Sequence, residues 1–172
     1  MLTEEQGKEL IALARESVEK AFKGEAAEVN GFDEARGVFV TIKKGEALRG
    51  CIGYPLPAKP LGRAVVEMAR AAAFEDSRFQ PLKEAELDEV SFEVSVLTVP
   101  EPVEPDAIVV GRDGLIIESG GRSGLLLPQV PVEWGWNREE YLEQLCAKAG
   151  LPRGAWRSAS LKRFQAQVFS ES

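Results

Sequence analysis

The chain has 172 residues, of which 44% are hydrophobic and 28% are charged, and its formal net charge is −7 at pH 7. This composition is typical of a globular protein with a sizeable core, and it argues against a broad nucleic-acid surface because phosphate binding needs clustered Lys and Arg. The chain contains no histidine, which excludes Ser-His-Asp and Cys-His catalysis, imidazole bases and His-ligated metals within it.

We expect a cytoplasmic protein, because no run of about 18 apolar residues occurs and the N-terminus starts with a polar, helix-forming segment. The two cysteines, Cys51 and Cys146, follow no CxxC spacing. The sequence therefore predicts reduced thiols, with neither a disulfide framework nor a metal site, and it suggests no cofactor.

The first half of the chain predicts a helix, a β-hairpin, a second helix and a further strand. Thr3 and Gln6 fit a capping box at the start of the first helix, and apolar residues recur at helical spacing behind them. Residues rich in Val, Ile, Phe and Thr mark the strands, and prolines between 55 and 60 separate the hairpin from the second helix. The expected bounds are residues 3–23, 38–43, 48–54, 60–74 and 90–98.

The second half contains shorter elements and more turns. Prolines between 100 and 105 form a stiff connector, which is the best candidate for a domain boundary. Asn137 and Glu140 fit a second capping box, for a helix that ends at Gly150, and residues 164–169 predict a last strand. Glycine-rich turns separate three short β-like segments, near residues 108–110, 115–118 and 125–127.

The segment Leu48–Gly53, with the sequence LRGCIG, is the candidate functional motif. Because side chains alternate along a strand, we expect two faces. Arg49, Cys51 and Gly53 share one face, and Leu48, Gly50 and Ile52 share the other. Gly50 and Gly53 are costly inside a strand unless a ligand, a bulge or a packed partner approaches the backbone closely.

Cys51 has two interpretations. A thiolate needs a lowered pKa to react at neutral pH, and Arg49 on the same face would lower it, which makes Cys51 the candidate catalytic residue. Alternatively, Cys51 is a small buried side chain fitted between glycines, since free cysteine is often buried. Cys146 lies on the apolar side of a helix and is expected in the core.

Arg49 and a polar segment near residue 76 supply candidate ligand-binding groups. If the next strand pairs nearby, Glu93 and Ser95 are the expected partners of Arg49 in a structural ion pair. In the functional interpretation, Arg49 instead binds the carboxylate or phosphate of a small molecule. Asp76 and Arg78 either line a pocket or cap and bridge a turn.

Six segments, spread in order over nearly the whole chain, resemble the AMMECR1 family. They are LRGCIG at 48–53, AFEDSRFQPL at 73–82, EVSVL at 93–97, GRDGLI at 111–116, GRSGLLLPQV at 121–130 and RFQA at 163–166. The resemblance implies an α+β protein with two unequal domains. The larger domain holds both termini around an antiparallel sheet with flanking helices, and the smaller α+β domain is inserted into it. On our boundaries the larger domain comprises residues 1–104 and 161–172, and the smaller one comprises 105–160.

The resemblance also implies a protein without an established activity, with LRGCIG as the usual candidate site. Some relatives are fused to, or encoded beside, Memo-like and radical-SAM proteins, so the resemblance makes these proteins candidate partners.

Three functions are compatible with these residues. The first is binding of a small anionic ligand around Arg49 and Cys51, or an accessory role in a modification reaction whose chemistry belongs to a partner. The second is a non-catalytic interaction or scaffold module, using a cleft between domains or the region of Trp134 and Trp136, although large aromatic residues usually close a core. The third is a Cys-dependent enzyme acting alone, which the missing base disfavours. The sequence leaves open whether the protein is an enzyme.

Overall fold

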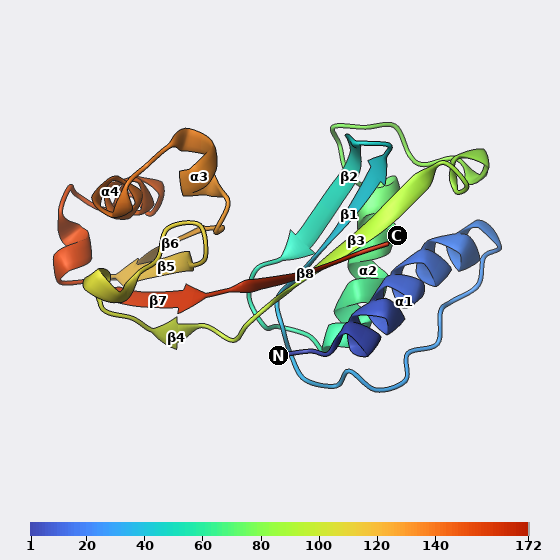
Figure 1. Cartoon of the computed structure of the whole chain (residues 1–172), viewed down its shortest axis with the longest axis horizontal. Helices are drawn as coiled ribbons and strands as arrows, with labels where there is room; N and C mark the ends of the chain where they lie inside the picture. The colour runs from blue at the N-terminus through green and yellow to red at the C-terminus, as the bar shows by residue number, and fades with distance from the viewer. Residues whose placement is uncertain (172) are drawn as a thin grey trace. The chain divides into compact units, whose positions relative to one another are not determined.

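The computed structural model describes residues 1–171, which form two compact units. Unit 1 comprises Met1–Leu97 and the C-terminal segment from Gln167, and unit 2 comprises Thr98–Ala166. Each unit has its own sheet, helices and hydrophobic core (Figure 1). The α+β class predicted from the sequence is therefore confirmed. No helix within the described residues is long and apolar enough to cross a bilayer.

Unit 1 is a four-stranded sheet with two helices on one face (Figure 1). Strand β1 pairs antiparallel with both β2 and β3, so β2 is an edge strand. In spatial order the strands are β2 (Ala47–Tyr54), β1 (Val38–Lys44), β3 (Val90–Leu97) and β8 (Ala166–Ser170). The helices are α1 (Glu4–Phe22) and α2 (Leu61–Phe74), and a single 3-10 turn, η1 (Glu84–Glu86), precedes β3.

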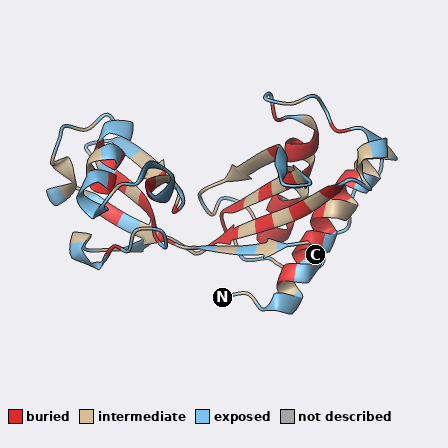
Figure 2. Ribbon diagram, turned by 45° about the horizontal axis from the view of Figure 1, so that its top comes forward, coloured by how far each residue is buried: buried red, intermediate tan, exposed pale blue. Residues whose placement is uncertain are grey.

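Alternation along β1 and β3 determines which side chains the helices cover. Val38, Val40 and Ile42 on β1 are fully buried, as are Val94 and Val96 on β3. Buried and half-buried segments alternate along the strands of this sheet in Figure 2. The residues between these buried positions are only half-buried, which places them on the opposite face. We call this opposite face the outer face of unit 1, defined by Phe39, Thr41, Cys51, Glu93 and Ser95.

Unit 2 is built on a second four-stranded antiparallel sheet. In spatial order its strands are β4 (Glu101–Pro102), β7 (Ser160–Phe164), β5 (Gly114–Ser119) and β6 (Arg122–Leu126). Its helical elements are η2 (Pro105–Ala107), α3 (Val130–Trp134), α4 (Arg138–Lys148) and η3 (Ala155–Arg157). Helix α4 packs against β5 and β6 and buries Cys146 in the core, as the sequence predicts. This sheet extends beyond the predicted smaller domain, 105–160, at both ends. Strand β4 precedes residue 105, and most of β7 follows residue 160.

Both predicted capping boxes are confirmed, at Thr3 for α1 and at Asn137 for α4. Two strand predictions were wrong. Residues 108–110 lead into a turn in which the Asp113 carboxylate accepts the Val109 N–H at 2.9 Å. Residues 164–169 are divided between β7 and β8, because the Gln165 N–H donates to the Thr98 hydroxyl at 2.8 Å and interrupts the ladder.

Candidate functional site

The β1–β2 hairpin places the Cys51 thiol on the outer face of unit 1. Thr41 lies directly opposite Cys51 in the register, and its hydroxyl donates a hydrogen bond to the Cys51 sulfur at 3.2 Å. Cys51 is half-buried rather than enclosed in the core. The residue is therefore partly exposed, and its thiol accepts a hydrogen bond from one neutral donor.

A β-bulge at Arg49 separates this residue from Cys51. Ile42 pairs with Gly50 and Lys43 with Leu48, so Arg49 has no partner on β1. The strict alternation predicted over Leu48–Gly53 was therefore wrong at this position. The extra residue keeps Gly50 opposite Ile42, toward the helices, and Cys51 opposite Thr41, toward the outer face.

Arg49 is already paired in the folded protein. Its Nε and one terminal nitrogen donate to the two carboxylate oxygens of Glu86, each at 3.1 Å, and both side chains are largely buried. Hydrogen bonds from Arg49, followed by the backbone N–H of Lys83, lower the pKa of Glu86 to about 2. The expectation that Glu93 and Ser95 pair with Arg49 was wrong, because β1 lies between β2 and β3.

Close packing explains both glycines of the motif. A Cβ atom at Gly50 would overlap the carbonyl oxygen of Ala72 on α2, so α2 can approach β2 only where no side chain is present. A Cβ atom at Gly53 would overlap the Phe39 ring and the Val38 carbonyl oxygen. Of the explanations considered from the sequence, a packed partner accounts for these glycines without a ligand.

Asp76 and Arg78 bind the free edge of β2 at Cys51. The Asp76 carboxylate accepts the Cys51 N–H at 3.0 Å and both Nε and a terminal nitrogen of Arg78, at 2.9 and 2.7 Å. Arg78 also donates to the Cys51 carbonyl at 3.4 Å. The Arg78 hydrogen bonds are the main cause that holds the pKa of Asp76 well below its usual range, and the Cys51 N–H adds to the effect. The Asp76 side chain is only 4% exposed, whereas that of Arg78 is 57% exposed.

Glu93 lies one strand beyond Thr41 and has other partners. It pairs with Thr41 across β1 and β3, and its carboxylate accepts from Lys43 at 3.2 Å and from the Ser170 hydroxyl at 3.1 Å. Ser95 lies opposite Phe39, one row further along.

The structure thus brings Cys51, Asp76 and Arg78 together with Thr41, and it pairs Arg49 with Glu86 instead. Sequence reasoning missed Thr41 and Glu86. The hairpin register would identify Thr41, but only with knowledge of the bulge. The Lys83 N–H donates to the Glu86 carboxylate at 2.8 Å, but the Lys83 side chain has no acceptor, so no capping-box pattern in the sequence marks Glu86.

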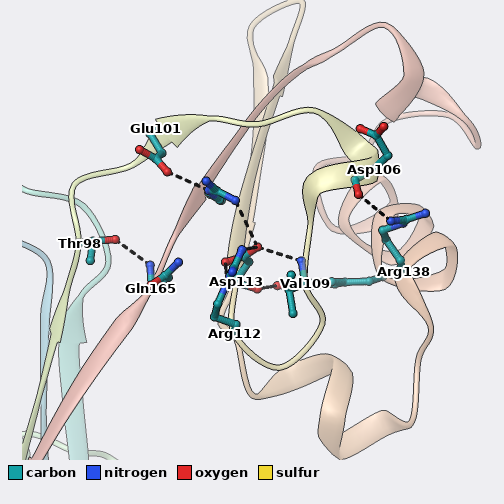
Figure 3. A network of polar contacts seen from close by, with 10 residues as sticks. Thr98, Glu101, Asp106, Val109, Arg112, Asp113, Arg138 and Gln165 are labelled. Carbon is teal, nitrogen blue, oxygen red and sulfur yellow. Dashed lines mark hydrogen bonds and ion pairs between the residues drawn. The ribbon is translucent and has the colours of Figure 1, made fainter.

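Unit 2 contains a separate ion pair in which the carboxylate is buried and the guanidinium is exposed, shown in Figure 3. Asp113 is fully buried and accepts hydrogen bonds from both Arg112, at 2.9 and 3.0 Å, and the Val109 N–H. Burial raises the pKa of Asp113, but these hydrogen bonds outweigh it and the pKa lies below its usual value. Because every contact of Asp113 shown here stays within the turn or the adjacent strands, we assign the pair a structural role.

Cavities lie on the surfaces of both units. One of about 430 Å³ lies along α4 at Glu140 and Glu143, and one of about 330 Å³ lies at Val103 and Trp156, both in unit 2. Another of about 330 Å³ lies in unit 1 at Arg36. Cys51 lines none of these three.

The comparison with known sequences decides the family. The sequence model of the AMMECR1 family matches residues 11–169 of this chain. The chain belongs to the AMMECR1 family. A protein of Thermococcus gammatolerans is 48% identical over 99% of this chain and 92% of its own length, and one of Methanothermobacter thermautotrophicus is 47% identical over 99% and 96%.

A solved structure supports the same conclusion for the fold. The crystal structure of an uncharacterised protein from Pyrococcus horikoshii superposes with a TM-score of 0.80, at 45% identity, over 99% of this chain and 94% of that chain. These relatives carry no description of an activity. Membership of the AMMECR1 family therefore establishes no biochemical function, and the site must be argued from its own residues.

Proposed function

We propose that the protein binds a small ligand with an acidic group beside Cys51, with Arg78 as the cation that recognises it. The observation that carries this proposal is the exposure of Arg78, whose side chain is 57% exposed while its guanidinium is fixed by Asp76 next to the Cys51 backbone. A guanidinium that is held in place loses little conformational freedom when an anion binds. Arg49 does not recognise the ligand, because its guanidinium already binds the Glu86 carboxylate.

The other groups near the thiol support binding more than catalysis by the chain alone. Thr41 is a neutral donor, Asp76 is held ionised by Arg78, and the chain contains no histidine that could serve as a base. Chemistry on the ligand would then come from a partner, and Memo-like and radical-SAM proteins are the partner classes to test first.

The test compares an anionic with a neutral thiol reagent. In a Cys146→Ala background, the ratio of the Cys51 rates with iodoacetate and iodoacetamide reports the local charge, since a nearby cation concentrates the anionic reagent. We expect Arg78→Gln to lower this ratio by about two- to five-fold, as one partly screened charge would. Arg78→Lys, which keeps the positive charge, should retain most of the wild-type ratio of the two rates.

Arg49→Gln is the matched control, because it removes a guanidinium whose Nε and one terminal nitrogen are already bound to the two carboxylate oxygens of Glu86. It should leave the ratio nearly unchanged. The proposal is wrong if Cys51 reacts only after unfolding, or if Arg78→Gln and Arg49→Gln have the same effect. If the charge effect is specific to Arg78, protection of Cys51 from iodoacetamide by inorganic phosphate or by citrate would identify the class of acidic group.

A second candidate function, a protein-interaction surface, is favoured by exposed apolar residues in unit 2. Trp134 is 70% exposed and stacks on Trp136 with ring centroids 6.2 Å apart, and Val132 beside it is 62% exposed. If this surface binds a protein, a partner that is identified by co-purification with the wild-type chain should no longer co-purify with the Trp134→Ser variant. The partner should still co-purify with the Val168→Ser variant, which changes an exposed apolar residue of unit 1.

A further inference from the structure

A second candidate site lies in unit 1, where the loop before β1 is fastened to the start of α2. The Leu61 N–H donates to the Glu34 carbonyl at 2.9 Å, and the Gly62 N–H donates to the Phe32 carbonyl at 3.0 Å. These bonds satisfy amide groups at the start of α2 and fix the loop in place. Between this loop and the N-terminal part of α1 lies the cavity of about 330 Å³.

Arg36 is the unexplained residue of this cavity. It is only 8% exposed, and its Nε donates to the Leu97 carbonyl at 2.7 Å. One terminal nitrogen lies 3.9 Å from a Glu34 oxygen, which is too long for a hydrogen bond. Among residues 1–171, no hydrogen bond to either terminal nitrogen of Arg36 is found.

These two nitrogens must nevertheless be open to solvent. In the described part of the chain, no buried side-chain nitrogen or oxygen lacks a hydrogen-bond partner. The terminal nitrogens of Arg36 have none, so they are not fully enclosed, although the residue as a whole is more than nine-tenths buried. Because Arg36 and Glu34 both line the cavity, we take the cavity to be the opening toward which these donors face. A bidentate carboxylate fits such a pair of donors.

The rim of the cavity has the opposite charge. Glu9, Asp33 and Glu34 also line it, and all three are exposed. A simple anion would meet one guanidinium and three carboxylates, so its binding would be opposed. A simple cation would leave the Arg36 donors unused. A molecule with a carboxylate at one end and positive charge at the other satisfies both parts.

We propose that this cavity binds a free α-amino acid with a basic side chain. Its carboxylate would lie on the terminal nitrogens of Arg36, and its positive groups would lie toward Glu9, Asp33 and Glu34. The volume is at the lower end of the range of small-molecule sites, which suits a single amino acid. The inference is independent of the Cys51 site, since none of these residues contributes to it.

The experiment is calorimetric titration of the full chain with L-arginine, and with three probes that each lack part of the pattern. Agmatine lacks the carboxylate, acetate lacks the cation, and inorganic phosphate is an anion without an ammonium group. We expect saturable binding of L-arginine and at least about tenfold weaker binding of each of the others, the loss expected for a charged hydrogen-bonded contact.

Two variants locate the site. Glu34→Gln changes a side chain that is 69% exposed and should weaken L-arginine binding by about two- to five-fold without affecting folding. Arg36→Gln should weaken it at least tenfold, and amide chemical shifts will report whether this variant remains folded. Glu46→Gln, which removes an exposed charge on the β1–β2 hairpin, is the matched control and should have no effect.

The proposal is overturned by absence of saturable binding of L-arginine at millimolar concentration. It is also overturned if agmatine, acetate or phosphate binds equally well, or if Glu34→Gln and Glu46→Gln are indistinguishable. In the wild-type chain, L-arginine should shift the amide resonances of Phe32, Glu34 and Leu61, and shifts confined to other residues would place the ligand elsewhere.

Discussion

The Asp76 carboxylate accepts the backbone N–H of Cys51 at 3.0 Å, although the two residues lie 25 positions apart. Because β2 is an edge strand, its outward N–H and carbonyl groups have no neighbouring strand to bind. Asp76 and Arg78 provide those partners at Cys51 and leave the thiol on the outer face. One pair of side chains therefore both closes part of the sheet edge and places a cation beside the thiol.

Asp76→Asn should destabilise unit 1 by about 2 kcal/mol, because it replaces charge-assisted hydrogen bonds of a buried carboxylate. Urea unfolding followed by far-UV circular dichroism measures the change. Tryptophan fluorescence is less suitable, since Trp134, Trp136 and Trp156 all lie in unit 2.

Asp106→Asn is the control for this variant. Asp106 is exposed, and its carbonyl rather than its carboxylate accepts the hydrogen bond from Arg138 at 2.9 Å (Figure 3). It should change the unfolding free energy by less than about 0.5 kcal/mol. Equal stability of the two variants would show that Asp76 does not hold the sheet edge.

Acid should destabilise unit 1 through Glu86. Its pKa is about 2 in the folded protein, against a usual value of 4.5. A carboxyl group with a lowered folded pKa contributes stability above its unfolded pKa and loses it as the pH falls through the folded one. The urea midpoint should therefore decrease between about pH 5 and pH 2, and Asp76 acts in the same direction.

Glu86→Gln should flatten this pH dependence and reduce stability at pH 7, since Arg49 would lose its charged partner. Glu46→Gln should leave the slope as it is in the wild type. A pH profile that is the same for Glu86→Gln and the wild type would mean that the Arg49–Glu86 pair contributes nothing to stability.

Local patterns predicted the elements of this fold well. The capping boxes at Thr3 and Asn137, and the alternation along β3, depend on residues within a few positions of each other, and each is present in the structure. The two strands that were wrong fail for different reasons. Residues 108–110 enter a local turn in which the Val109 N–H donates to the Asp113 carboxylate, whereas the interruption within 164–169 is tertiary. Gln165 pairs with Thr98, a residue 67 positions away, and no local pattern encodes that contact.

The site was less predictable because one bulge changes every pairing beyond it. If the hairpin turn is counted without a bulge, Lys44 pairs with Ala47 and Thr41 then falls opposite Gly50. The observed extra residue at Arg49 moves Cys51 opposite Thr41 instead. The partners Glu86 and Asp76 come from a segment that folds back on β2, and only the tertiary structure reveals them.

Gly50→Ala should cost about 3 kcal/mol, at the upper end of the range for inserting a methyl group into a packed core, because the new Cβ meets the Ala72 backbone rather than a movable side chain. Urea unfolding measures it, and Leu48→Ala on the same strand is the control, since Leu48 is 40% exposed. If Gly50→Ala is as stable as the wild type, the glycine is not required by the packing of α2, and a ligand near the backbone becomes the better explanation.

Thr41→Val tests whether the hydrogen bond to the Cys51 sulfur affects the thiol. The substitution keeps the β-branched shape and removes the donor that lies 3.2 Å from the sulfur. A hydroxyl that donates to sulfur stabilises the thiolate more than the thiol, so its loss should slow iodoacetamide alkylation of Cys51 by up to about tenfold near neutral pH.

Ser95→Ala removes a hydroxyl from the same outer face, one row away, and should leave the rate unchanged. Equal rates for Thr41→Val and the wild type would show that the thiol is not tuned by β1. Slowing by both variants would instead indicate a general change of the outer face.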